Sequence, residues 1–594
     1  MTGGAILKGL TKSIQTRSIQ TRLRILSILL TAAVLVAVSG TCFAVQYIKA
    51  PPLVDAVKAQ VQDVKDNKSL RAPLITWGGD IATILANGNS RSTAAGSIFA
   101  ERNLQLELTR TDDFKEQIKA YMQGETPYLR GTMGMINMAA ELLNRDPRTK
   151  PVIIYQMTWS NGGDCLVVKP GIRSAKDLKG KTIALQAYGP HVDYLAKLLR
   201  DAGLKMSDVT IKWVKDLTGT ENSPAEALDS KEVDAAMVIT PDGLMLTSNG
   251  SVGTGSEGSV KGAKIMLSTK SASRIIADVY AVRSDYFTAH KQEVEHFVHG
   301  LLLGEQKLKT LLKNKKSRMA DYKKTVTAAA EILLDSASAT ADAEALYGDC
   351  EYVGFHGNVK FFTDTHWPRN LHRLTEEVQS AFITGGLLSR KIPLQQADWD
   401  YKALRKGLAG LDDVETPKFN REAVAQVVAR KQNLGTLDEG ELFSFEVFFK
   451  PNQNSFSADQ YSDAFAKVVD LASTYGGAVI TVEGHSDPMG YLRKVKDKAS
   501  DIVLSRTKQA AKNLSLTRAI AVRDAVMAYS ADKGVNLDPS QFTVIGQGIM
   551  HPRTGLCGKL PCAPKTKEEW LSNMRVVFRI IQIEAEAEAF IPLD

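Results

Sequence analysis

The stretch VEGHSDPMGY (residues 482–491) joins the end of a β-rich run to a Gly-x-x-Asp turn, and a strongly basic segment follows it. Before it lie FSFEVFFKPNQNSF, a strand that starts at Phe443 and ends in a polar turn, and a helix with its apolar residues on one face. After it come the helix LSLTRAIAVRDAVMAYSADKG, expected to start at Leu514, and the strands FTVIGQG and NMRVVFRI. This order of elements predicts a small α/β sandwich over residues 441–583.

The motifs of this region resemble a known family. The pieces that carry the resemblance are Gly484-His485-Ser486-Asp487, LSLTRA from Leu514, GQG followed by Pro552, and Asn573-x-Arg575. The region is similar to the OmpA-like peptidoglycan-binding domain, which the MotB and Pal families also carry. The resemblance implies that Asp487 and Arg518 hold the diaminopimelate residue of the peptidoglycan stem peptide. It also implies binding roles for residues around them: Gly484, Ser486, Asn513, Asn573 and Arg575.

The chemistry of the ligand suits the two central residues. Diaminopimelate carries an ammonium and a carboxylate on one carbon, so a carboxylate on a turn and an Arg in the first turn of a helix can recognise it together. A plain Asp487–Arg518 surface ion pair is the alternative. The insertion 491–513 between them holds seven basic and two acidic residues. A solvated helical face is expected there, and contact with anionic wall polymer or lipid is the alternative.

Length and composition limit the remaining possibilities. A chain of 594 residues is too long for one core, so two or three domains are expected. The apolar fraction of 44% is that of globular protein rather than of a multi-span membrane protein. The net charge of +8 is a mild excess at this length, which makes nucleic acid an unlikely class of partner.

The N-terminal region predicts a membrane anchor. Residues 25–45 form an uncharged run that is long enough to cross a bilayer, five basic residues precede it, and the first acidic residue of the chain is Asp55. We therefore expect a cytoplasmic stub (1–24), an inner-membrane helix, and a periplasmic remainder that begins with a polar, helix-like spacer (46–70). A cleaved signal peptide ending at Ala44 is the alternative.

The middle of the chain, residues 71–412, alternates short β-rich runs with amphipathic segments, which favours a largely parallel α/β sheet. The segments GIRSAKDLKGKTIAL, AGLKMSDV, EVDAAMVITPD and IADVYAVRSDYF occur in the order that they have in type 2 periplasmic solute-binding proteins. The region resembles the nitrate and sulfonate branch of these ABC-transporter binding proteins. The resemblance implies a two-lobed clamshell, with chain crossings near Cys165–Lys169 and Asp278–Val282 and lobe 2 at about 168–277.

In this fold the solute lies in the cleft between the lobes, held by loops and helix N-termini. The topology predicts these solute-binding residues: Trp77, Gly78, Asp80, Ser160, Asn161, Tyr188, Thr240 and Asp242. No Arg or Lys stands among these loops to neutralise an anion, whereas Asp80, Asp164 and Asp242 would repel one. A zwitterionic or cationic small molecule is compatible with this set, and so is an empty cleft.

The cysteines and histidines predict one disulfide and no catalytic or metal site. Cys557 and Cys562 bracket the turn CGKLPC, and such a pair in an oxidising compartment favours a disulfide. The nine histidines are scattered, and neither His-x-x-x-His, Gly-x-Ser-x-Gly nor a phosphate-binding Gly-rich loop occurs. We therefore expect no enzymatic activity, no cofactor and no metal.

Together these features predict an α/β protein with one transmembrane helix, a clamshell, a linker (413–440), an OmpA-like domain and a tail (584–594). Such a chain would bind peptidoglycan and present a solute-binding module in the periplasm. A different class remains open, namely a wall-anchored, stator-like subunit or partner of an ion-driven membrane motor complex. Segment 25–45 has no Asp or Glu that could carry the ion itself.

Overall fold

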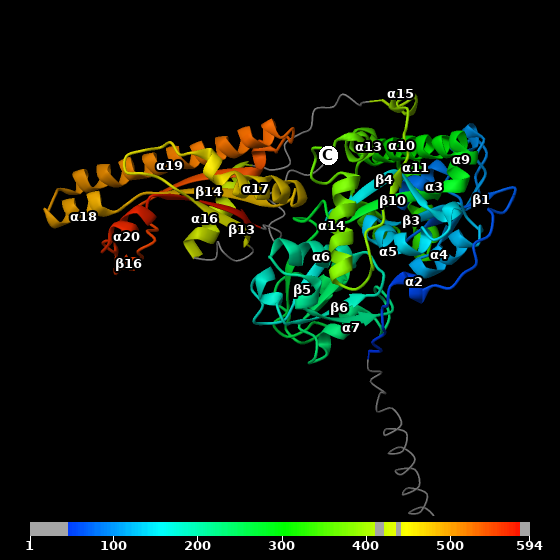
Figure 1. Cartoon of the computed structure of the whole chain (residues 1–594), viewed down its shortest axis with the longest axis horizontal. Helices are drawn as coiled ribbons and strands as arrows, with labels where there is room; N and C mark the ends of the chain where they lie inside the picture. The colour runs from blue at the N-terminus through cyan, green and yellow to red at the C-terminus, as the bar shows by residue number, and fades with distance from the viewer. Residues whose placement is uncertain (1–44, 410–420, 435–440, 582–594) are drawn as a thin grey trace, which may run out of the picture. The chain divides into compact units, whose positions relative to one another are not determined.

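The structure, a computed structural model, describes residues 45–409, 421–434 and 441–581 (Figure 1). The predicted stub 1–24, nearly all of the predicted membrane helix 25–45, and the tail 584–594 lie outside these residues. Within the described part of the chain, no helix is both long and apolar enough to span a bilayer.

Lobe 1 is built on a sheet in the order β11-β4-β10-β3, and β12 also pairs with β4. Strands β3, β4 and β10 are buried along their whole length, as expected for a sheet covered by helices on both faces. The other elements of this lobe are two paired strands and the helices around them. The bounds are β1 Leu70–Leu74, α3 Asp80–Ala86, β2 Leu106–Arg110, α4 Phe114–Met122, β3 Tyr128–Thr132, α5 Met133–Leu143, β4 Pro151–Ser160, β10 Ala277–Arg283, α9 Ser284–Ala289, α10 Lys291–Lys313, α11 Met319–Leu334, α12 Thr340–Gly348, β11 Cys350–Tyr352, α13 Gly354–Thr363, α14 Leu371–Thr384, β12 Gln395–Gln396 and α15 Tyr401–Leu404.

Lobe 2 has its own sheet, in the order β7-β6-β8-β5-β9. β6 runs parallel to β7 and β8, whereas β5 runs antiparallel to β8 and β9. In lobe 1, β10 is likewise antiparallel to β3 and β4. The sheets are therefore mixed rather than largely parallel, because the strand that follows each crossing runs against its neighbours. The bounds in lobe 2 are β5 Asp164–Val168, β6 Thr182–Gln186, α6 His191–Asp201, β7 Thr210–Val214, α7 Pro224–Asp229, β8 Ala235–Ile239, α8 Thr240–Leu246 and β9 Lys264–Ser268.

Both chain crossings lie earlier than the sequence predicts. Cys165 to Val168 already belong to β5, so the first crossing is the turn 161–163, where Gly162 adopts a φ of 111° that favours glycine. The second crossing is the segment 269–276, because β10 is a strand of lobe 1 from its first residue. Lobe 2 therefore begins at Asp164 instead of about residue 168.

The spacer is also different from the prediction. Its one regular element is the short helix α2 (Leu53–Ala56), and Leu53, Val54 and Val57 are buried. The Arg283 guanidinium donates to the Gln62 carbonyl at 2.8 Å. Burial of these apolar side chains holds residues 50–65 against lobe 1. The segment therefore does not form a free helical spacer.

The C-terminal region has the predicted order of strands and helices, with an added hairpin. Its sheet runs β13-β18-β14-β15, in which β14 and β15 are parallel and the other pairs antiparallel. Helix α19 packs on β14 and β15, and α17 packs on α19 (Figure 1). The bounds are α16 Arg421–Leu434, β13 Glu441–Phe448, α17 Ser462–Thr474, β14 Val479–His485, α18 Met489–Lys496, α19 Asp501–Asp532, β15 Phe542–Gly548, β16 Leu556–Cys557, β17 Leu560–Pro561, α20 Lys567–Ser572 and β18 Arg575–Ile581.

The helix expected to start at Leu514 starts thirteen residues earlier, at Asp501. The basic insertion forms α18 and the first part of α19, as the helical-face interpretation expected. Residues 501–513 contain no Gly or Pro, and seven of the thirteen are Ala, Lys, Gln, Arg or Leu, which favour helix, so nothing in the sequence stops the helix before Leu514. Arg518 therefore lies in the middle of a long helix and not in its first turn.

Candidate functional site

The turn after β14 is held by close contacts with α19 and β15. A Cβ at Gly484 would lie 1.8 Å from the Ser515 carbonyl oxygen, so only glycine lets α19 approach the strand this closely. The Ser486 N–H donates to the Gly548 carbonyl at 2.7 Å, and its hydroxyl donates to the Ala511 carbonyl at 2.9 Å. Gly484 and Ser486, both predicted as binding residues, thus fix the position of Asp487.

Arg518 is buried beneath this turn, with 1% of its surface exposed. Its guanidinium donates to three backbone carbonyls, those of Gln453 at 2.8 Å, Lys450 at 3.3 Å and His485 at 3.4 Å. It also lies over the ring of Phe449, 5.2 Å from the centroid. Burial lowers the pKa of Arg518. Within the described residues no carboxylate forms an ion pair with Arg518, so its charge is solvated by carbonyl dipoles and one aromatic ring.

Asp487 has one carboxylate oxygen that is engaged and one that is not. Its Oδ2 accepts from the Met489 N–H at 2.9 Å, while its buried Oδ1 has no hydrogen-bond partner. Burial raises the pKa of Asp487, and the Met489 N–H and the side chains of Trp570 and Asn573 act in the opposite direction. The structure shows no ion pair between Asp487 and Arg518 among the described side chains, in contrast to the surface-pair alternative.

The other predicted residues of this site divide into two groups. Asn513 is exposed on α19 and its Oδ1 accepts from Gln509 Nε2 at 2.8 Å. Asn573 accepts from the Arg553 N–H at 2.7 Å, and Arg575 pairs with Glu446 at 3.1 Å. Asn573 therefore belongs to the structure around the turn, whereas Asn513 faces solvent.

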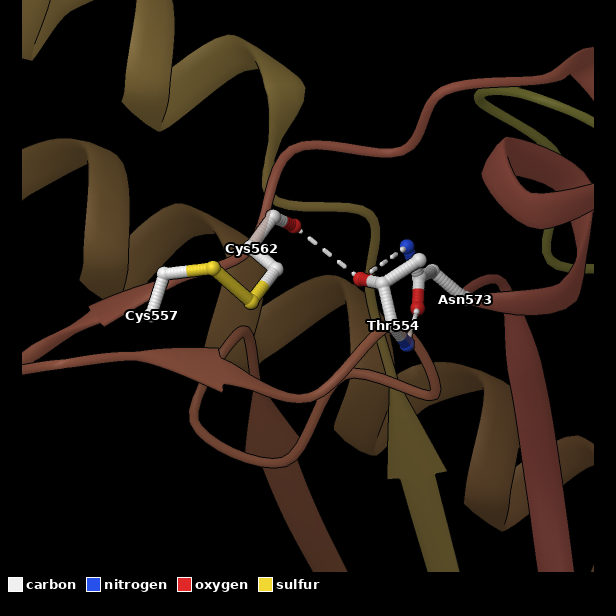
Figure 2. Close-up of a disulfide and its surroundings, with 4 residues drawn as sticks. All are labelled: Thr554, Cys557, Cys562 and Asn573. Atoms are coloured by element: carbon white, nitrogen blue, oxygen red, sulfur yellow. Dashed lines mark hydrogen bonds between the residues drawn. A yellow bond between two sulfur atoms is a disulfide. The ribbon is translucent and has the colours of Figure 1, made fainter.

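A disulfide lies next to Asn573 (Figure 2). Cys557 and Cys562 are joined across the β16–β17 hairpin. Thr554 connects the hairpin to the site, because its hydroxyl donates to the Cys562 carbonyl at 3.0 Å and its N–H donates to Asn573 Oδ1 at 3.3 Å. The bridge thus stabilises the segment that holds Asn573.

In the clamshell, the structure brings many of the predicted cleft residues together around the first crossing. Trp77 Nε1 donates to Thr158 Oγ1 at 3.0 Å, and the indole covers Gly163, where a Cβ would lie 2.6 Å from the ring. The Asn161 N–H donates to the Asp349 carbonyl at 2.8 Å. Thr240 donates to the Gly162 carbonyl. Gly78 lies beside this group, and its carbonyl accepts from Tyr352 Oη at 2.6 Å.

Ser160 belongs to a buried polar cluster at the same crossing. Its hydroxyl donates to Asp164 Oδ2 at 2.6 Å and lies 2.8 Å from Thr269 Oγ1. The other Asp164 oxygen is 2.7 Å from His191 Nε2. His191 is fully buried, and its Nδ1 has no hydrogen-bond partner. His191 and Thr269 are site residues that sequence reasoning missed, since neither belongs to a recognisable motif.

Three further predicted residues are placed differently. Asp80 is fully buried and forms an ion pair with Arg130 at 2.9 Å, and Arg130 also pairs with Asp278 at 2.8 Å. Asp80 therefore has a structural partner instead of facing a solute. Tyr188 donates to the Pro51 carbonyl at 2.7 Å, outside the cluster at the crossing. Asp242 is near His191, and its Oδ2 has no hydrogen-bond partner.

Burial dominates the electrostatics of this region. Desolvation raises the pKa of Asp80 to about 7, of Asp349 to about 7, and of Asp193, a residue of α6, to about 8. It raises the pKa of Asp242 as well. Arg130 opposes this effect at Asp80, while Asp164 reinforces it at Asp349. Among the residues that the structure describes, no group of three or more His, Cys, Asp or Glu side chains is arranged to hold a metal ion.

Comparison with known proteins gives one family match. The model of the family described as NMT1/THI5 like matches residues 98–340. This range covers all of lobe 2 and parts of lobe 1 on both sides of it, through β10 and α11. None of the curated proteins matches the sequence. The matched segment supports a solute-binding-protein-like interpretation of the clamshell.

Several solved structures are similar to part of the chain. The periplasmic aliphatic sulphonate binding protein SsuA from Escherichia coli is 13% identical, and the match covers 59% of this chain and 98% of that one, with a TM-score of 0.38. A putative periplasmic sulfonate-binding protein SsuA from Methylobacillus flagellatus is 17% identical, with coverage of 60% and 99% and a TM-score of 0.39. The desulfurization enzyme DSZB is 16% identical, with coverage of 55% and 95% and a TM-score of 0.33. The absence of catalysis stays a prediction.

Proposed function

We propose that this protein is an envelope protein that binds diaminopimelate-type peptidoglycan through its C-terminal region and presents a non-catalytic, solute-binding clamshell in the periplasm. Two observations carry the proposal. Arg518 is buried with no carboxylate partner among the described residues, and it donates to the His485 carbonyl of the turn that carries Asp487. Asp487 Oδ1 has no hydrogen-bond partner there. The NMT1/THI5-like match and the two-lobed topology support the clamshell part. Anchoring by residues 25–45 and the stator-like alternative both depend on residues outside the described part of the chain.

The two side chains suit a zwitterionic centre. A carboxylate of the ligand can replace the weak carbonyl contacts of Arg518 with charge-assisted hydrogen bonds, and an ammonium can donate to Asp487 Oδ1. Such a ligand gives the buried Arg518 and the half-buried Asp487 a charged partner at the same time. Diaminopimelate supplies both groups on one carbon, whereas a lysine at the same place of the stem peptide lacks the carboxylate.

The test is co-sedimentation of the detergent-solubilised full chain with purified peptidoglycan. We expect the chain to pellet with diaminopimelate-type sacculi, and at least tenfold less with lysine-type sacculi at equal mass. Arg518→Ala and Asp487→Ala should each leave the protein in the supernatant. Arg518→Lys and Asp487→Asn are the conservative versions, and both should bind more weakly because the fork geometry or the charge is lost.

The matched controls are Arg523→Ala and Asp524→Ala, which remove an exposed ion pair from the same helix. Both should pellet like the unmodified chain. Equal binding to the two wall types, or binding that survives both Arg518→Ala and Asp487→Ala, would contradict the proposal. Thermal melts of each variant show whether a loss of binding reflects unfolding.

A further inference from the structure

Asp193 lies in the contact between the two lobes. It belongs to the first turn of α6, which packs on the lobe 2 sheet, and its carboxylate meets the first turn of α5, which packs on the lobe 1 sheet. A Cβ at Gly134 would lie 2.4 Å from Asp193 Cγ, so the glycine makes room for the carboxylate. Asp193 is 2% exposed, and neither of its side-chain oxygens has a hydrogen-bond partner.

This position is one where proteins commonly bind anions. The first N–H groups of a helix and its dipole favour negative charge, and α5 and α6 both direct their N-termini at this contact. Thr132 caps α5 by accepting from the Met135 N–H at 3.2 Å, and the N–H groups of Asp193 and Tyr194 act on the carboxylate. The Asp193 side chain thus occupies the place that an anionic head group would need.

The cations in this part of the clamshell already have carboxylate partners. Arg130 is already paired with Asp80 and Asp278, and Arg369 is paired with Glu377 at 3.0 Å. His191 Nε2 is engaged with Asp164, as described above. Arg369 and Asp278 act on Asp193 with opposite signs. Two backbone N–H groups act on the carboxylate, but no described cation pairs with Asp193. A buried carboxylate without a cationic partner is costly, so the partner that it lacks is a donor that carries positive charge.

We propose that Asp193 sets the charge of the solute: the clamshell takes a small molecule whose protonated amine binds between the first turns of α5 and α6, and it excludes sulfonates and other anions. The inference rests on the proposed solute-binding function. An ammonium offers three donors to the two oxygens of Asp193 and favours the ionised carboxylate. Above the pKa of Asp193, where the carboxylate is ionised, an anionic head group would meet a like charge. Because Asp193 is buried between the lobes, the solute reaches it when α5 and α6 move apart.

The experiment compares two probes that share a propyl chain, propylammonium and propanesulfonate. Isothermal titration calorimetry is run on the full chain in detergent at pH 9, above the pKa of about 8 of Asp193, and at constant ionic strength. We expect the unmodified chain to bind propylammonium at least tenfold more tightly than propanesulfonate. Asp193→Asn, which keeps the shape and removes the charge, should weaken propylammonium binding at least tenfold and strengthen propanesulfonate binding. Asp229→Asn, at an exposed carboxylate of the same lobe, should change neither affinity.

The inference is overturned if the unmodified chain binds propanesulfonate as tightly as propylammonium, or if Asp193→Asn leaves the ratio unchanged. It is also overturned if neither probe binds either chain, since Asp193 then selects nothing. That last result removes the solute-binding part of the proposed function too, whereas propanesulfonate binding would leave that part intact. Co-sedimentation of the same preparations with peptidoglycan decides the wall-binding part independently.

Discussion

Two of the buried arginines among the described residues, Arg130 and Arg518, differ in the partners of their guanidinium groups. Arg130, in lobe 1, is 0% exposed and lies between two carboxylates, Asp80 and Asp278. Arg518, in the C-terminal region, is 1% exposed and meets only backbone carbonyls and an aromatic ring. The exposed fraction is nearly the same in both cases, so burial alone does not separate Arg130, a structural residue, from Arg518, for which we propose a binding role. The presence or absence of a carboxylate partner does.

The largest expected effect is the loss of stability in Arg130→Met. Removing the cation leaves Asp80 and Asp278 buried side by side without compensation, which costs about 3–5 kcal/mol in comparable buried pairs. Arg518→Met should cost about 1 kcal/mol, because it removes hydrogen bonds to carbonyls that can turn to water. Chemical unfolding of the two variants, followed by circular dichroism, measures the difference.

Two outcomes would break this comparison. If Arg518→Met destabilises the chain as much as Arg130→Met, then Arg518 is a structural residue. Its lack of a carboxylate partner then gives no evidence for ligand binding. If Arg130→Met is nearly neutral, the Asp80–Arg130–Asp278 cluster is not what holds α3 to the lobe 1 sheet. Arg318→Met, at an exposed pair with Asp321, is the matched control and should stay within about 0.5 kcal/mol of the unmodified chain.

A second comparison, between two glycines of the C-terminal region, should give a smaller effect. A Cβ at Gly484 would collide with the Ser515 carbonyl, which is backbone and cannot rotate away, so Gly484→Ala should cost about 2–3 kcal/mol and loosen the Asp487 turn. Gly490 lies in α18 with no atom within 4 Å of its Cβ position. Gly490→Ala should therefore stabilise the chain by up to about 1 kcal/mol. Opposite signs in thermal melts support the close contact of β14 with α19; equal effects contradict it.

The sequence predicted the structure best where a motif consists of residues close together in the chain. The Gly484–Asp487 turn, the LSLTRA segment and the order of strands and helices could be read directly, because each is local. Cys557 and Cys562 are five residues apart, so a bridge between them was also a local inference. The predicted start of α19 at Leu514 was wrong. The family pattern places the start there, but the preceding residues also favour helix, and the helix therefore begins at Asp501.

The clamshell site was harder to predict because its partners are distant in sequence. Arg130 and Asp80 are 50 residues apart, and Arg130 and Asp278 are 148 apart. Asp193 lies in an ordinary amphipathic helix, and only the approach of α5 in three dimensions makes it unusual. Asp80 was expected to face a solute because it follows a strand, but a strand end does not show whether the side chain already has a partner. The prediction of a free spacer was wrong for a related reason. Leu53, Val54 and Val57 are buried only because lobe 1 provides a surface for them.

The last prediction, small for each pH unit, is a pH dependence of stability with opposite signs in the two regions. His485 is buried near Arg575, Arg579 and His551, and desolvation lowers its pKa to about 3, below the value of about 6.5 of a free histidine. Between these values the unfolded chain binds a proton that the folded chain does not, so this histidine makes stability fall as the pH falls. For Asp193 the folded pKa is about 8, above the usual value of about 3.9, so the folded chain holds the extra proton and stability falls as the pH rises from about 4 to 8.

Each group should contribute a slope of roughly 1 kcal/mol per pH unit in its range. His485→Gln should flatten the loss of stability between pH 6 and pH 4, and Asp193→Asn should flatten the loss between pH 5 and pH 8, each leaving the other slope unchanged. His372→Gln, at an exposed histidine of α14, is the control and should leave both slopes in place. Unfolding free energies at one-unit pH intervals measure all three. If Asp193→Asn has no effect above pH 5, the carboxylate is already satisfied by donors in the folded chain, and the argument that it awaits a cationic solute fails with it.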